Sequence, residues 1–151
     1  MAEHLQETIK QATFIQRTPE EVFDAVTSAE VWNAFFTHSS TLDPRPGGAF
    51  IWKWKDWGPD CYTVEVPGTV IEAKSPERFV FEWGNDNPTR ITMILSEKSD
   101  GTILRLTEQG YADDSKGRAM ALECAAGWGE AVTLLKFYLE HGLTYTTPPT
   151  K

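Results

Sequence analysis

The chain has 151 residues, of which 40% are hydrophobic and 24% charged, and it carries a formal net charge of −8. This composition is typical of one globular domain, which we expect to span residues 1–151. Without a cluster of Lys and Arg, and without an apolar stretch approaching the ~18 residues of a membrane-spanning helix, the chain is expected to bind neither nucleic acid nor membranes.

The N-terminal part of the chain predicts one strand followed by two short helices. Residues 7–16 contain apolar and β-branched side chains typical of a strand. Thr18 and Glu21 have the spacing of a capping box, which predicts a helix that starts at Pro19. Ser28 predicts the start of the second short helix.

Period-two alternation dominates residues 49–109 and predicts about six antiparallel strands. Phe50, Trp52 and Trp54 alternate with more polar positions, so their rings are expected on one face. Pro67-Gly68 predicts a bulge or bend that breaks this ladder. The alternation of aromatic and charged side chains is typical of an antiparallel sheet with one buried face.

A long helix is predicted at residues 115–141, with Gly127-Trp128-Gly129 at its centre. Small and aliphatic side chains recur at helical spacing on the stripe of Trp128. Each glycine destabilises a helix interior by about 1 kcal/mol relative to Ala, which indicates close backbone approach or empty volume beside Trp128. Strands followed by this helix indicate an α+β fold, and residues 144–151 predict a frayed tail.

Four segments resemble a known family in this order: residues 17–25, 42–50, 79–83 and 127–140. They are similar to the single-domain relatives of the C-terminal domain of the heat-shock ATPase activator, in the START-related, birch-pollen-allergen-like SRPBCC superfamily. The resemblance implies a helix-grip fold, in which a curved antiparallel sheet of six to seven strands surrounds the C-terminal helix and a hydrophobic cavity. It also implies binding of lipids, sterols, polyketides or plant hormones, cyclisation or dehydration in some members, and a link to the stress response.

The predicted ligand-binding wall is the inward face of the strands, closed by the second short helix and the last helix. Tryptophan and tyrosine combine a large apolar ring with a polar atom, which suits a mostly apolar pocket. The alternative is that the same side chains fill a solid core, and the sequence leaves both open. The predicted site residues are Trp32, Phe36, Trp52, Trp54, Tyr62, Phe81, Trp83, Met93, Leu106, Glu108, Trp128 and Val132.

Glu108 is the candidate catalytic residue. Strand alternation places it on the face of Leu104 and Leu106, so its carboxylate is expected to point inward. A buried carboxylate can serve as general acid, general base or ligand anchor, here assisted by Tyr62 or His38. The alternative is a solvated carboxylate at the end of its strand.

The remaining polar and exposed residues predict little chemistry. Cys61 and Cys124 fit no metal-ligand pattern, so we expect no metal and no cofactor. Reduced thiols in a cytoplasmic protein are the favoured interpretation, with a disulfide as the alternative, and no secretory signal is visible. Leu122 and Phe137 lie opposite Trp128 on the helical wheel, which indicates either a dimer or partner surface or a face that the sheet covers.

Three functions from different classes follow from these features. The leading hypothesis is a non-enzymatic protein that binds a small apolar molecule between the sheet and the last helix. The second is a cyclase- or dehydratase-type enzyme that uses Glu108. The third is a chaperone-ATPase accessory that acts through protein–protein contact, which the family resemblance alone suggests, and a homodimer remains open.

Overall fold

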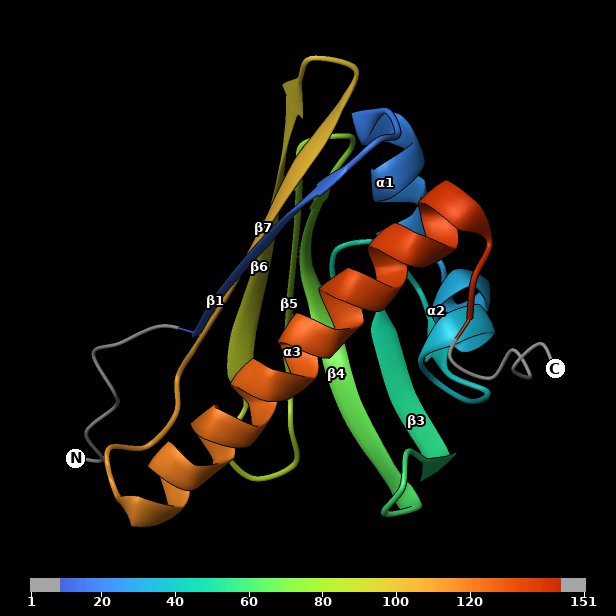
Figure 1. Ribbon diagram of the computed structural model, residues 1–151. Helices are drawn as coiled ribbons and strands as arrows, with labels where there is room; N and C mark the ends of the chain where they lie inside the picture. The colour runs from blue at the N-terminus through green and yellow to red at the C-terminus, as the bar shows by residue number, and fades with distance from the viewer. Residues whose placement is uncertain (1–8, 145–151) are drawn as a thin grey trace, which may run out of the picture.

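The computed structural model describes residues 9–144, which form a seven-stranded sheet and three helices. Helix α3 lies diagonally across one face of the sheet (Figure 1). Neighbouring strands are antiparallel in the order β1-β7-β6-β5-β4-β3-β2, which confirms the predicted α+β helix-grip fold. All of the predicted tail except Thr144 lies outside the described residues. The elements are β1 (Ile9–Ile15), α1 (Pro19–Val26), α2 (Ala29–Phe35), β2 (Thr41–Leu42), β3 (Ala49–Trp57), β4 (Tyr62–Lys74), β5 (Arg78–Trp83), β6 (Thr89–Lys98), β7 (Gly101–Gln109) and α3 (Ser115–His141).

Local capping interactions fix where the helices begin and end. Thr18 accepts the backbone N–H of Glu21 at 3.2 Å in the predicted capping box of α1. At the start of α3, the Asp114 carboxylate accepts the backbone N–H of Gly117 at 2.7 Å. Gly142, with a φ of 69°, ends α3 in the left-handed conformation that glycine adopts without steric cost. These short-range contacts define the first turn of α1 and both ends of α3.

The predicted break at Pro67-Gly68 is wrong, because β4 continues through both residues. Gly68 lies opposite Phe50 of β3, and a Cβ atom at this position would collide with the Phe50 ring. The glycine therefore permits a close ring–backbone contact inside the sheet rather than ending it. The register between β4 and β5 shifts instead between Val70 and Glu72.

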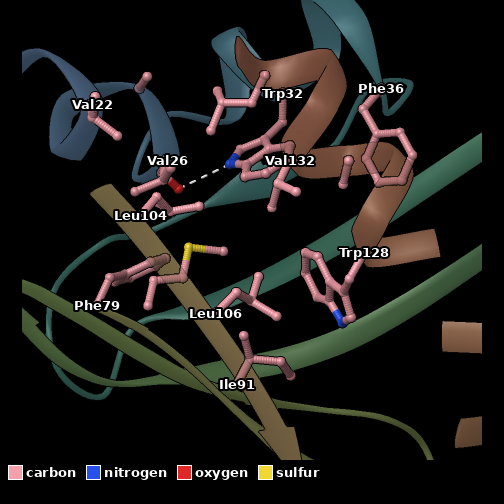
Figure 2. Close-up of a cluster of buried hydrophobic side chains, with 14 of the residues drawn as sticks. Val22, Val26, Trp32, Phe36, Phe79, Ile91, Leu104, Leu106, Trp128 and Val132 are labelled. Atoms are coloured by element: carbon pink, nitrogen blue, oxygen red, sulfur yellow. Dashed lines mark hydrogen bonds between the residues drawn. The ribbon is translucent and has the colours of Figure 1, made fainter. Parts of the chain in front are cut away.

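The core lies between the sheet, α1, α2 and the C-terminal half of α3. Figure 2 shows Trp128 and Val132 of α3 projecting toward Leu106 of β7, and the Trp32 indole beside α1. The Trp32 N–H donates to the Val26 carbonyl at 2.9 Å. Apart from Gly117, the buried residues of α3 all lie between Trp128 and Leu135, so the N-terminal half of this helix packs less closely on the sheet.

Candidate ligand-binding pocket

A pocket of about 780 Å³ lies between the N-terminal half of α3 and the ends of β3, β4 and β5. This volume falls within the ~300–1,000 Å³ of small-molecule sites. Tyr111 and Ala112, which follow β7, also line the pocket. Tyr62 lines it with a side chain that is 53% exposed, so the pocket is open to solvent on that side.

Five aromatic rings form a continuous wall of this pocket. Phe36, at the end of α2, packs against Trp54 and Trp57 with ring centroids 5.5 and 5.2 Å apart. Trp54 lies 6.2 Å from Trp83, and Trp83 lies 5.2 Å from Trp128 on α3. Edge-on and tilted contacts of this kind hold each ring in a defined orientation. The wall therefore connects the sheet with both helices that flank it.

The two glycines beside Trp128 have different roles. A Cβ atom on Gly127 would meet no atom of residues 9–144 within 4 Å, and Gly127 lines the pocket. A Cβ atom on Gly129 would lie 3.2 Å from the Gln11 amide, whose N–H₂ donates to the Ala125 carbonyl at 2.8 Å. Gly127 thus provides open volume and Gly129 a close contact with β1, which are the two explanations that the sequence left open.

Glu108 is fully buried behind the aromatic wall. Its carboxylate accepts the indole N–H of Trp83 at 2.9 Å, the indole N–H of Trp128 at 2.8 Å and the hydroxyl of Thr89. The predicted inward orientation is confirmed, and the solvated strand-end alternative is wrong. All three donors line the pocket, whereas Glu108 does not. The carboxylate therefore fixes the two tryptophans of the wall from the side that faces away from the pocket.

Tyr111 and Cys124 are pocket residues that the sequence did not assign to the site. Burial raises the pKa of the Tyr111 phenol, and the charge of Glu108 and contact with Cys124 raise it further. Burial also raises the pKa of the Cys124 thiol. Both groups are therefore neutral near pH 7, which makes them hydrogen-bonding groups rather than nucleophiles.

The structure divides the twelve predicted site residues into two sets. Five line the pocket, namely Phe36, Trp54, Tyr62, Trp83 and Trp128. The other seven are buried away from its surface, namely Trp32, Trp52, Phe81, Met93, Leu106, Glu108 and Val132. Strand and helix periodicity places both sets on the inward face. The first set borders the pocket, and the second set is buried in the core.

His38, Leu122 and Phe137 lie apart from the pocket wall. His38 is exposed and does not line the pocket, so the structure does not bring it to Glu108. Cys61 and Cys124 are both free, and the disulfide alternative is wrong. Leu122 is 75% exposed and Phe137 42% exposed, so the sheet does not cover this face of α3.

A curved antiparallel sheet that holds a C-terminal helix over an aromatic pocket defines the helix-grip class of proteins. Within the described residues, no helix is long and apolar enough to cross a membrane, and no cluster of three metal-ligating side chains forms. The model of the family described as "Activator of Hsp90 ATPase homolog 1-like protein" matches residues 16–140. The chain belongs to this family, as the resemblance predicted.

Solved structures share the fold at low sequence identity, and no curated protein matches the sequence. The protein SSP2350 from Staphylococcus saprophyticus is 24% identical, with a TM-score of 0.75 over 94% of this chain and 98% of its own. The Aha1 dimer from Colwellia psychrerythraea is 18% identical, with a TM-score of 0.74 over 91% and 98%. CalU16 from Micromonospora echinospora is 20% identical, with a TM-score of 0.70 over 94% and 85%. These likenesses extend to the fold alone.

Proposed function

We propose that this protein binds a small, largely apolar molecule in the pocket between α3 and the ends of β3, β4 and β5. The observation that carries the proposal is the 780 Å³ of space beside Gly127, bounded by the aromatic wall. Gly127 weakens the helix by about 1 kcal/mol relative to Ala. Because no neighbouring atom excludes a Cβ there, packing does not require this glycine. Preserving the volume of a binding site is the role we assign to it.

The geometry of Glu108 favours binding over acid–base catalysis. A general acid or base must come within hydrogen-bond reach of the substrate. The Glu108 oxygens already accept hydrogen bonds from Trp83, Trp128 and Thr89, and these donors lie between the carboxylate and the pocket. We therefore place the cyclase- or dehydratase-type alternative below simple binding, with Glu108 as a positioning residue.

Replacing Gly127 by a residue with a large side chain, which would occupy part of the pocket, tests the proposal. The neutral dye N-phenyl-1-naphthylamine, which fluoresces in apolar surroundings, serves as the probe. We expect the wild-type protein to bind the dye and Gly127→Phe to weaken binding at least about fivefold, since a benzyl group removes a substantial part of the volume. Ala119→Phe is the matched control, because Ala119 is exposed on the same helix and does not line the pocket.

Thermal unfolding of both variants establishes that they fold. Dye affinity that is unchanged by Gly127→Phe, or reduced equally by Ala119→Phe, would show that the dye binds elsewhere. Failure of the wild-type protein to bind the dye would also contradict the proposal.

A further inference from the structure

The rim of the pocket is strongly acidic. Among the pocket-lining residues that the structure describes, five carry a carboxylate and only Lys116 carries an ammonium group. Lys116 lies in the first turn of α3, where Asp114 caps the helix and offsets the positive end of its dipole. The five acidic residues are Asp60, Asp86, Asp114, Glu123 and Glu130.

Three indole N–H groups of the aromatic wall already donate hydrogen bonds to carboxylates. Trp83 and Trp128 donate their indole N–H groups to Glu108, and Trp57 donates its own to Glu130 at 3.1 Å. These three donors are already engaged, so an anionic group would have to compete with Glu108 and Glu130 for them. Hydrogen bonding to an anion also polarises an indole toward higher electron density in its ring. Such rings attract cations.

Glu108 adds a negative charge directly behind this wall. It has no exposed surface, and the three groups that donate hydrogen bonds to it, from Trp83, Trp128 and Thr89, are neutral. None of the ion pairs found within residues 9–144 includes it. Because water is excluded around a buried carboxylate, its field is screened less than that of the rim residues.

The acidic rim, the indole rings and the buried Glu108 all favour the same kind of ligand. We propose that the pocket selects apolar molecules that carry a positive charge, such as aromatic or aliphatic amines, over neutral or anionic molecules of the same shape. The proposal rests on the proposed function and specifies the chemistry of its ligand. The apolar part of the guest packs against the rings, and its ammonium group lies toward the acidic rim and the indole faces.

Three compounds with one skeleton separate charge from shape. They are 2-naphthylmethylamine, which is cationic at pH 7, the neutral 2-naphthalenemethanol, and the anionic 2-naphthoate. Each competes with N-phenyl-1-naphthylamine for the full-length protein. We expect the amine to bind at least about fivefold more tightly than the alcohol, and the carboxylate most weakly. Raising the salt from 20 to 500 mM is expected to weaken binding of the amine and to leave the alcohol unchanged, because salt screens only the charge interaction.

Charge removal at the rim locates the source of the preference. A triple variant, Asp60→Asn, Asp86→Asn and Glu123→Gln, leaves the hydrogen-bonded Asp114 and Glu130 intact. We expect it to bind the amine about three- to tenfold more weakly and the alcohol within about twofold of wild type.

A control triple variant changes the net charge by the same amount away from the pocket: Glu20→Gln, Glu30→Gln and Glu97→Gln, all exposed and none lining it. It is expected to retain the preference for the amine.

The outcomes separate this inference from the proposed function. If the alcohol binds as tightly as the amine, or the carboxylate binds more tightly, the charge preference is overturned while dye binding still supports an apolar pocket. If none of the three compounds displaces the dye, the inference is likewise overturned. A preference for the amine that survives in the rim variant, or is lost equally in the control variant, would contradict the rim as its source.

Discussion

Replacing Glu108 by Gln perturbs the connection between the two tryptophans of the wall. One carboxylate oxygen accepts from Trp83 and Thr89 and the other from Trp128. An amide presents one acceptor and one N–H₂ donor. Whichever way the introduced amide is turned, one indole N–H therefore faces a donor and loses its partner.

The magnitude follows from these three bonds. A buried N–H left without an acceptor costs about 1–3 kcal/mol, and the bonds that remain lose the extra strength of an ionised acceptor. Removing a buried charge that lacks a cation offsets part of this loss. We expect a net loss of about 2–4 kcal/mol in the free energy of unfolding. In a domain of this size that corresponds to a fall in Tm of roughly 4–16 °C.

Urea unfolding followed by tryptophan fluorescence measures this loss, and a double-mutant cycle assigns it. With Trp128→Phe, the Gln amide can turn its oxygen toward Trp83, so that no indole N–H is left without an acceptor. Trp128→Phe should therefore cost about 1–3 kcal/mol less in the Glu108→Gln background than in wild type. Glu97→Gln, at an exposed position of β6, serves as a control and should leave stability unchanged. Wild-type stability of Glu108→Gln, or additivity in the cycle, would refute the assignment of Glu108 as the anchor of the wall.

Three further predictions use the same contacts. Trp32→Phe should cost about 1–3 kcal/mol more than Trp52→Phe in urea unfolding, because Trp32 donates to a buried carbonyl whereas the buried Trp52 N–H has no hydrogen-bond partner among the described residues. Gly127→Ala should raise the free energy of unfolding by up to about 1 kcal/mol, since its methyl group meets open space and Ala favours the helix. Iodoacetamide at pH 8 should modify the exposed Cys61 before Cys124, whose raised thiol pKa lowers its thiolate fraction, and mass spectrometry of peptides resolves the two sites.

Each of these three predictions would be contradicted by a specific result. Equal costs for the two tryptophan variants would show that the Trp32 hydrogen bond contributes no net stability. Destabilisation by Gly127→Ala would contradict the open space beside α3. Modification of Cys124 first would contradict its partial burial and its raised thiol pKa.

Much of the fold follows from local patterns in the sequence. Period-two alternation identifies the strands, the spacing of Thr18 and Glu21 identifies the start of α1, and the stripe around Trp128 identifies the inner face of α3. The error at Pro67-Gly68 has a physical cause. The sequence signals a weak ladder there, but Gly68 is required by a ring on the neighbouring strand, which one-dimensional spacing does not reveal.

The site is less predictable because its members share a face with the core. Alternation places Trp52 and Trp54 on the same side of β3, yet only Trp54 lines the pocket. Tyr111 follows the end of β7, where no periodicity applies. Glu108 was expected to point inward, but its three donors come from β5, β6 and α3, so its role depends on tertiary contacts.

Three consecutive residues at the centre of α3, Gly127, Trp128 and Gly129, have different roles in the site. Successive residues of a helix point about 100° apart, so Gly127, Trp128 and Gly129 face three different surroundings. Gly127 faces the open pocket, Trp128 contributes a wall and donates to Glu108, and Gly129 faces Gln11 of β1. A larger residue at the first position would fill the pocket, and one at the third would press on β1. Because Trp128 is fixed to Glu108 between them, its ring can border the pocket without closing it.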